Sequence, residues 1–259
     1  MINFDLLEKN KEELRLRYLT ASPYPHIAIE NFCDRERLLK AYDSIPLLEN
    51  KSRDYMFAGN KFEKSNYGTL GPELLELQEE LRSDRMNKLL TFITCENTFV
   101  DPKNYGGGLH QGRENTFLDM HLDFNYHPMH KLWWRSLNLL LYMNKDWKEE
   151  YGGHLELEDL RTGERKSCKV DFNTLIIQKC SDYTLHGYYP TKFPEGVWRT
   201  SIATYAFTKH IKQIAKPRTT DWFPDKEGDG SLKKWFGRNF HHAVKVKTKI
   251  FGSATAKNQ

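Results

Sequence analysis

The segment FLDMHLDF, residues 117–124, alternates between two kinds of side chain with a period of two. Such alternation predicts a β-strand, because successive side chains of a strand point to opposite faces of its sheet. Asp119, His121 and Asp123 then share one face with Phe117, and four apolar residues share the other. An exposed face has no need for a histidine and an aspartate two residues apart. We therefore expect the polar face to line a cavity and the apolar face to pack under a layer of helices.

The same period of two continues from about residue 95 to residue 208. Turn signals such as Gly152-Gly153 and Arg161-Thr162-Gly163 separate the segments. Several short strands without helices between them favour an antiparallel sandwich or barrel over a parallel sheet. The strands that we expect cover residues 117–124, 135–143, 154–158, 172–178 and 198–207.

The first 94 residues are expected to be mostly helical and to support the strands. Asn3 is predicted to cap a helix over residues 4–18, and Asp34 to cap another over residues 35–45. The other elements expected here are a proline-led strand at 22–31, a loop with room for short strands at 51–71, and one or two helices at 71–93.

The composition fits a globular protein, with 39% hydrophobic and 29% charged residues in a chain of 259. No apolar run is long enough to span a bilayer, and the N-terminus has no apolar segment typical of a secretory signal. The four cysteines show no C-x-x-C spacing, which argues against a zinc ribbon or a redox pair. We expect reduced thiols and a cytoplasmic protein.

Positive charge is concentrated at the C-terminal end. From Lys209 onward there are twelve Lys plus Arg against four Asp plus Glu, whereas residues 1–208 carry a net charge of −4. A basic extension of this kind can contact an acidic partner. A solvated extension without a partner is the simpler interpretation.

A second histidine completes a possible metal site with the first motif. His186, in the segment TLHGYYP, follows Asp123 by sixty-three residues. Two histidines and one carboxylate form the facial set that holds non-haem Fe(II) and leaves positions open for a bidentate co-substrate and dioxygen. Taken singly, the motif His121-x-Asp123 is a weak signal, and His186 would more often be a structural histidine.

An arginine on the last expected strand supplies a possible anion site. Arg199 and Ser201 share one face of the segment VWRTSIATYA. A guanidinium that points into a cavity needs an anion, and its planar fork matches a carboxylate. Tyr142 lies on the polar parity of its own strand and is a plausible second donor. The alternative is that Arg199 pairs with an acidic side chain of the protein.

Together these motifs resemble the Fe(II)/2-oxoglutarate-dependent dioxygenases, and the nearest branch is the prolyl 4-hydroxylase-like catalytic domain. The resemblance covers roughly residues 95–208. The segments that carry it are HLD (121–123), LLLYMNKDW (139–147), GGHLEL (152–157), LHG (185–187) and WRTS (198–201). It implies a mainly β fold with flanking α, in which a double-stranded β-helix core, or jelly-roll, is packed by N-terminal helices. Residues 1–94 would then be helical support elements, 95–208 the core and 209–259 a basic C-terminal extension.

The resemblance also implies a role for each site residue. His121, Asp123 and His186 would be the iron ligands, and Arg199, assisted by Tyr142 and Ser201, would hold the distal carboxylate of 2-oxoglutarate. The implied reaction is hydroxylation of an unactivated C–H bond of a peptidyl proline, an amino acid or another small molecule. It is coupled to conversion of 2-oxoglutarate and dioxygen into succinate and carbon dioxide. Ascorbate is an expected accessory reductant.

Two other functions remain open at the level of sequence. A nucleic-acid demethylase would use the same iron chemistry, and the basic extension favours it, but no groove rich in aromatic and basic residues is evident. A non-catalytic jelly-roll that only binds metal would be expected to have lost at least one of the four key side chains. His127 and His130, in the loop 125–131, are expected to be surface histidines or substrate contacts rather than a second metal site.

Overall fold

The computed structural model describes residues 1–49, 51–225 and 229–237. Its helices are α1 (Phe4–Lys9), α2 (Lys11–Leu19), α3 (Arg35–Asp43), α4 (Pro72–Leu81) and α5 (Asp84–Thr94), with short 3-10 turns η1 (Tyr67–Leu70) and η2 (Glu149–Tyr151). Its strands are β1 (His26–Glu30), β2 (Lys51–Tyr55), β3 (Ala58–Lys64), β4 (Thr98–Val100), β5 (Gly108–Leu122), β6 (Trp133–Tyr142), β7 (Leu155–Asp159), β8 (Arg165–Cys168), β9 (Thr174–Lys179), β10 (Thr184–Tyr188), β11 (Arg199–Lys209) and β12 (Asp221–Trp222).

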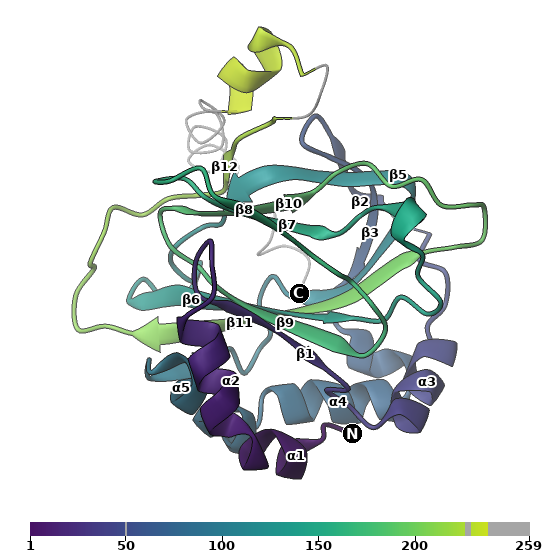
Figure 1. Cartoon of the computed structure of the whole chain (residues 1–259), viewed down its shortest axis with the longest axis vertical. Helices are drawn as coiled ribbons and strands as arrows, with labels where there is room; N and C mark the ends of the chain where they lie inside the picture. The colour runs from purple at the N-terminus through teal and green to yellow at the C-terminus, as the bar shows by residue number, and fades with distance from the viewer. Residues whose placement is uncertain (50, 226–228, 238–259) are drawn as a thin grey trace.

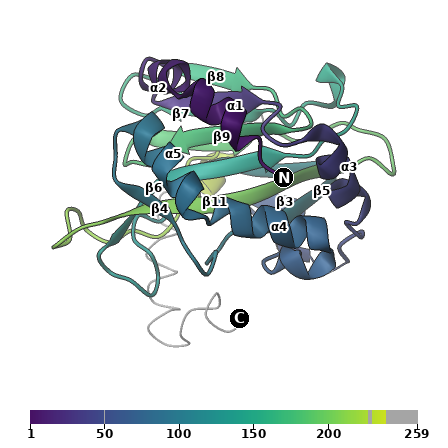
Figure 2. The ribbon, with the colours of Figure 1, turned by 90° about the horizontal axis from the view of Figure 1, so that it is seen from below.

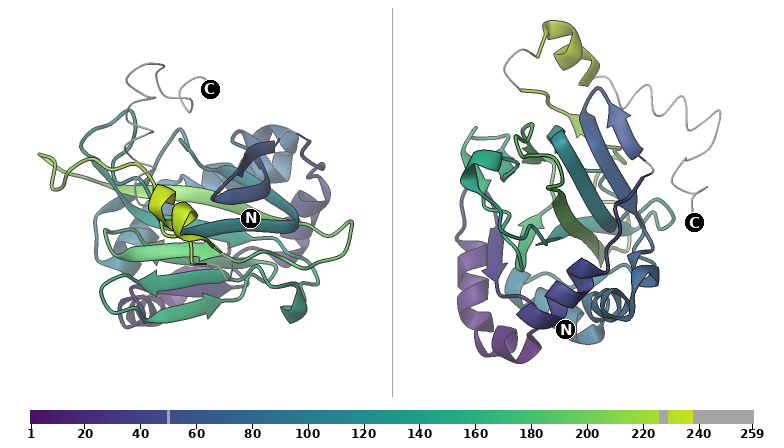
Figure 3. Two further views of the ribbon diagram at one scale, coloured as in Figure 1. Left: turned by 90° about the horizontal axis from the view of Figure 1, so that it is seen from above. Right: turned by 90° about the vertical axis from the view of Figure 1, so that its right-hand side faces the viewer.

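The strands form a bent antiparallel sheet in the order β1-β9-β6-β11-β5-β10-β7-β8. The half made of β1, β9, β6 and β11 faces the half made of β5, β10, β7 and β8 (Figures 1 and 3). Strand β5 joins the two halves, because its first residues pair with β11 and its last residues pair with β10. This arrangement is the jelly-roll predicted from the sequence.

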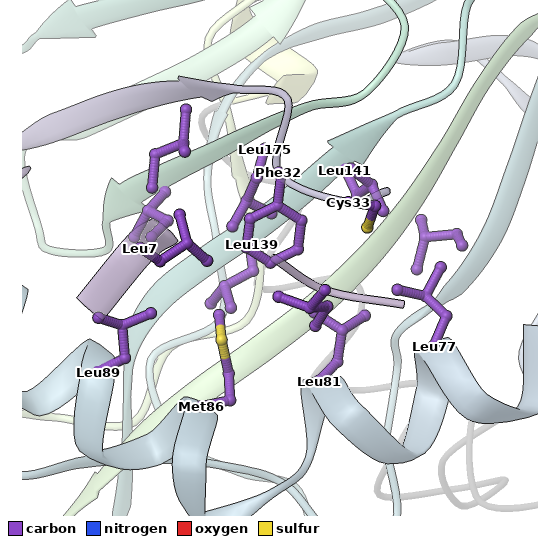
Figure 4. Close-up of a cluster of buried hydrophobic side chains, with 14 of the residues drawn as sticks. Leu7, Phe32, Cys33, Leu77, Leu81, Met86, Leu89, Leu139, Leu141 and Leu175 are labelled. Atoms are coloured by element: carbon purple, nitrogen blue, oxygen red, sulfur yellow. The ribbon is translucent and has the colours of Figure 1, made fainter. Parts of the chain in front are cut away.

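Helices α1 to α5 cover the outer face of the β1-β9-β6-β11 half (Figures 1 and 2). The alternation of β6 explains why, because Leu137, Leu139 and Leu141 all belong to the apolar cluster shared with the helices. Figure 4 shows Leu139 and Leu141 among side chains from α4 and α5. The intervening residues of β6 (Asn138, Leu140 and Tyr142) face the other way and line an internal cavity.

The helix caps were predicted with mixed success. Asp34 caps α3 as expected, since its carboxylate accepts the N–H of Arg37 at 2.9 Å. Asn3 does not cap α1 through its side chain, which instead donates to the main-chain oxygen of Asn31. The single helix predicted for residues 4–18 is two helices, because Asn10 leaves helical geometry and serves as the C-cap of one and the N-cap of the next.

Two of the remaining sequence predictions can be compared with the fold. All four cysteines are unpaired thiols, and only Cys95 is exposed. Within the described residues, every helix is too short or too polar to cross a bilayer.

Shortening a core side chain of β6 is expected to destabilise the fold strongly. Leu139 is 1% exposed at the centre of the helix-facing cluster. Leu139→Ala should lower the free energy of unfolding by about 3 kcal/mol, because a buried Leu-to-Ala change removes burial and leaves a cavity. Urea denaturation measures the difference. Leu47→Ala, at a position that is 58% exposed, is the matched control and should change stability by less than about 0.5 kcal/mol.

Candidate metal and anion site

Strands β5 and β10 bring the two predicted ligand histidines together. His121 and His186 are direct partners across the two strands, and their ring centroids lie 4.2 Å apart. Asp123 follows β5 by one residue, with its carboxylate 3.3 Å from Nε2 of His186 and 3.7 Å from Nε2 of His121. The three side chains can each offer one atom to a metal ion, and these atoms lie within 4.8 Å of one another.

The strict alternation predicted for residues 117–124 is interrupted by a bulge. Leu118 and His121 both line the cavity although they are three residues apart, and the pairing of β5 with β10 shifts register between them. Asp119, predicted to share the face of His121, instead pairs with Lys233 at 2.9 Å. Met120 and Leu122 belong to a small apolar cluster with Leu185 and not to the cluster shared with the helices, so the prediction that this apolar face packs under a layer of helices is wrong. The bulge explains why the polar and apolar faces are mixed.

Glycine is required opposite the bulge. A Cβ on Gly187 would lie 2.6 Å from the main-chain oxygen of Leu118 and 2.9 Å from the nitrogen of Met120. Both are backbone atoms of β5, so a side chain here would push β10 away from β5. The glycine after His186 therefore lets the two histidines approach each other.

Hydrogen bonds and burial set the protonation state of the ligands. His121 donates from Nδ1 to the main-chain oxygen of Asp119 at 2.9 Å, which leaves Nε2 free of its proton and turned toward the metal position. Burial, followed by the neighbouring His186, lowers the pKa of His121 to about 3. Burial also lowers the pKa of His186. Both imidazoles are neutral at neutral pH, as metal binding requires.

The carboxylate of Asp123 is ionised in spite of its burial. Desolvation opposes its charge, but Arg135 and the two histidines hold its pKa well below the usual range. Two neutral imidazoles and one carboxylate on a buried cavity wall form the donor set that suits a divalent iron ion. The residues present therefore fit the metal that the sequence implies.

Arg199 lines the same cavity, and its side chain is buried and held in place by its neighbours. It is 6% exposed, donates from Nε to the main-chain oxygen of Gly153 at 2.8 Å and lies over the ring of Tyr188. Its Nη2 is 3.4 Å from the hydroxyl of Tyr142. Among the described residues no carboxylate lies within ion-pair distance of Arg199. The alternative that it pairs with a protein acid is not realised there.

Unlike Arg199, the other Lys and Arg side chains that line the cavity have carboxylate partners. Lys61, Arg135 and Arg218 each pair with a carboxylate of the protein, at distances of 3.0, 2.9 and 2.6 Å. Arg199 is thus the cavity cation left for a bound anion in the part of the chain that the structure describes.

Strand pairing arranges the polar residues beside Arg199 in two rows. Lys61 on β3, Gly112 on β5 and Arg199 on β11 are successive cross-strand partners. In the next row inward, Ser201 pairs with His110 on one side and with Tyr142 on the other. The structure therefore brings Arg199, Tyr142 and Ser201 together as predicted.

The cavity has a volume of about 640 Å³ and contains both groups of residues. One wall comes from the segment 217–220, which follows β11. Trp222 of β12 pairs with His121 across the strands and packs against its ring at 4.9 Å. The predicted division at residue 209 stays a prediction, and much of the basic extension, residues 226–228 and 238–259, lies outside the described residues.

Sequence reasoning missed three residues of the site. Lys61 gave no signal, because the pairing of β3 with β5 is not visible in the local pattern. The role of Trp222 was hidden for the same reason. Asn138 could have been found, since it shares the polar parity of Tyr142 on β6.

Of the two histidines in the loop 125–131, His130 is exposed, as predicted, and His127 is not. His127 is buried rather than on the surface, and its Nε2 lies 3.2 Å from the carboxylate of Asp101. His130 stacks on Trp133 at 3.9 Å between ring centroids. The two form a structural cluster outside the cavity lining, although Tyr126 and Pro128 of the same loop do line it.

The contact between Asp101 and His127 predicts a pH-dependent part of the stability. Burial opposes ionisation of Asp101, but hydrogen bonds from His127 and from the N–H groups of Lys103 and Tyr105 lower its pKa. A lowered folded-state pKa stabilises the protein above the unfolded value of about 3.9, and this contribution disappears as the pH falls through the folded-state pKa. Asp101→Asn should therefore cost about 1–3 kcal/mol near pH 7.

The measurement is urea denaturation of the parent and Asp101→Asn from pH 7 down to pH 3. The difference between the urea concentrations at which the two proteins are half unfolded should become smaller below about pH 4. Exposed Asp43→Asn is the control and should show no such trend. A gap that stays constant over this range would contradict the assignment.

Comparison with known proteins gives one family and one fold. Residues 105–207 match the family model of the 2OG-Fe(II) oxygenase superfamily. No curated protein matches the chain. Among solved structures, a prolyl hydroxylase from Trichoplax adhaerens in complex with a peptide fragment of the hypoxia inducible factor oxygen degradation domain is 15% identical. The alignment covers 80% of this chain and 94% of that one, with a TM-score of 0.54.

Two further structures are prolyl 4-hydroxylases at 16% identity. That from Pseudomonas putida aligns over 77% of this chain and 99% of its own, with a TM-score of 0.52. That from Phytophthora capsici aligns over 99% of this chain and 82% of its own, with a TM-score of 0.56. At these identities the likeness shows a shared fold. The matched family model, the jelly-roll and the buried His–Asp–His group agree, and the matched part of the chain, residues 105–207, is a domain of the 2OG-Fe(II) oxygenase superfamily, a dioxygenase among the oxidoreductases.

Proposed function

We propose that the protein hydroxylates an unactivated C–H bond, using Fe(II), 2-oxoglutarate and dioxygen and releasing succinate and carbon dioxide. One observation carries the proposal. A complete set of two histidines and one carboxylate shares a single cavity with a buried arginine that has no carboxylate partner among the described residues. A site that only stored metal would have no use for that arginine.

His121, His186 and Asp123 would hold Fe(II), each through one atom. Three protein ligands leave positions for the co-substrate and dioxygen. When bound, the iron would activate dioxygen, and 2-oxoglutarate would supply two of the electrons for its reduction. The protein binds the two in register, orients the substrate and excludes water from the reacting atoms.

Arg199 would hold the distal carboxylate of 2-oxoglutarate, with Tyr142 and Ser201 as neighbouring donors. Burial raises the pKa of Tyr142, so its hydroxyl keeps the proton that it would donate. Because Arg199 is fixed by Gly153 and by the ring of Tyr188, little side-chain freedom remains to be lost when the anion binds.

The substrate class that we propose is a prolyl residue, a free amino acid or another small molecule with an apolar group. Phe124, Tyr126 and Tyr205 line the cavity near the metal ligands, joined by Pro128 and Pro217. Such a wall suits a saturated ring or an aliphatic chain. We also propose that ascorbate restores iron oxidised in turnovers without substrate.

Anaerobic addition of Fe(II) and 2-oxoglutarate to metal-free protein tests the proposal. A weak visible charge-transfer band of the chelate should appear in the parent and be absent in His186→Ala. Pyruvate, which lacks the distal carboxylate, should give the band only at much higher concentration. If both acids gave the band at the same concentration, Arg199 would not be the residue that binds the distal carboxylate. If the parent gave no band with 2-oxoglutarate, the proposed function would be refuted.

A further inference from the structure

The two carboxylate oxygens of Asp123 have different surroundings. Oδ2 accepts a hydrogen bond from Nδ2 of Asn138 at 2.8 Å and pairs with Nη2 of Arg135 at 2.9 Å. Oδ1 is the atom nearest to Nε2 of His121, at 3.7 Å. Two donors therefore occupy Oδ2, which also lies 3.3 Å from Nε2 of His186, whereas Oδ1 accepts from neither of them and is nearest to His121.

Arg135 is held rigidly in this position. Its Nε and Nη2 both donate to Oδ1 of Asn138, at 3.0 and 2.7 Å. Its guanidinium lies over the rings of Tyr205 and Phe124, at 3.6 and 4.4 Å, and the residue is 2% exposed. A buried cation so fixed cannot turn away from Asp123, and solvent screens its charge little.

We infer that Arg135 and Asn138 are positioning residues that restrict Asp123 to binding iron through Oδ1 alone and favour the Fe(II) state. The inference rests on the metal ligands of the proposed function. A carboxylate that bound through both oxygens would fill one of the positions needed by 2-oxoglutarate or dioxygen. Asn138 also lies 3.3 Å from Nε2 of His186, so its amide is in contact with two of the three ligands.

The charge of Arg135 has a second effect, on iron oxidation. When Fe(II) is oxidised outside the productive reaction, it loses one electron and dioxygen gains it as superoxide. The extra positive charge on the metal is disfavoured by a fixed cation close to one of its ligands. Arg135 should therefore slow this oxidation while the protein waits for substrate.

Air oxidation of the Fe(II)-loaded protein, without 2-oxoglutarate, provides the test. Loss of Fe(II) is followed with a chelating dye, and the reduction potential is measured by spectroelectrochemistry. Arg135→Met should oxidise about tenfold faster than the parent and show a lower potential. Arg161→Met is the matched control, because Arg161 also pairs with an aspartate and stacks on a tyrosine but does not line the cavity. It should match the parent.

Two further variants separate charge from geometry. Arg135→Lys keeps the charge but loses the planar fork, so it should oxidise slowly like the parent. Its Co(II)-loaded form should show an altered visible spectrum, as should that of Asn138→Ala, because Oδ2 has lost a donor. If Arg135→Met is recovered unfolded, the Co(II) spectra of Arg135→Lys and Asn138→Ala decide whether Arg135 and Asn138 position Asp123.

Three outcomes would overturn the inference. They are oxidation of Arg135→Met at the parent rate, oxidation of Arg135→Lys as fast as Arg135→Met, and unchanged Co(II) spectra in both Arg135→Lys and Asn138→Ala. Failure of the parent itself to bind metal is a different result, and it would refute the proposed ligands rather than the role of Arg135.

Discussion

Arg199→Met should weaken the use of 2-oxoglutarate by roughly 30- to 3,000-fold. Truncating one partner of a buried, hydrogen-bonded charge pair costs about 2–5 kcal/mol, and each 1.4 kcal/mol is about tenfold. The effect should fall on the concentration of 2-oxoglutarate needed for half-maximal succinate formation, measured at saturating Fe(II). Metal affinity should stay close to that of the parent, because Arg199 contacts none of the three ligand side chains.

Tyr142→Phe provides the graded comparison for this prediction. Its hydroxyl lies 3.4 Å from Nη2 of Arg199, so its removal should cost about 1 kcal/mol, the usual net value of one hydrogen bond. A Tyr142→Phe effect as large as that of Arg199→Met would place the main anion contact on the hydroxyl. An unchanged requirement for 2-oxoglutarate in Arg199→Met would show that the cosubstrate binds elsewhere.

His121→Ala should abolish metal binding and lower turnover by roughly a thousandfold or more, because a catalytic metal supplies several kcal/mol of transition-state stabilisation. Equilibrium dialysis with Co(II) or Mn(II) measures the metal, and succinate formation measures the activity. The protein should remain folded, since His121 is a small part of the buried surface.

His26→Ala is the matched control for this histidine. His26 is also buried, and its Nδ1 also contacts the main-chain oxygen two residues before it, in this case Tyr24 at 2.7 Å. It does not line the cavity. His26→Ala should lose stability but keep metal bound, and loss of metal in both variants to the same extent would point to unfolding instead of ligand removal.

Local sequence patterns were sufficient to predict much of the fold and many residues of the site. Period-two alternation located β6 and β11 and placed Tyr142 and Arg199 on inward faces, because strand geometry alone fixes which side chains share a face. The helix cap at Asp34 was equally local. The ligand set His121, Asp123 and His186 was predicted from residue types and is brought together by the structure.

The remainder depended on contacts between distant segments. Strand β10, which carries His186, was not predicted as a strand, because its five residues, which include Gly187, show no clear alternation. The bulge between Leu118 and His121 depends on how β5 pairs with β10, β3 and β11, and a short window of sequence does not contain these long-range pairings. Nothing in the local sequence could show that Lys61 is aligned with Arg199.

The position of β5 between the two sites limits where the chain can tolerate inserted or deleted residues. Its residue Gly112 lies in the row of Arg199, and nine residues later His121 pairs with His186. The span between these two positions therefore sets the separation of the anion contact from the metal ligands. A single residue inserted or deleted within 113–120 would turn the side chains that follow it to the opposite face of β5 and would change the separation of the Arg199 row from the metal ligands. The turn at 160–163 does not line the cavity and has no such constraint. A scan of insertions along the chain should show the stretch 113–120 as one of its least permissive regions for activity.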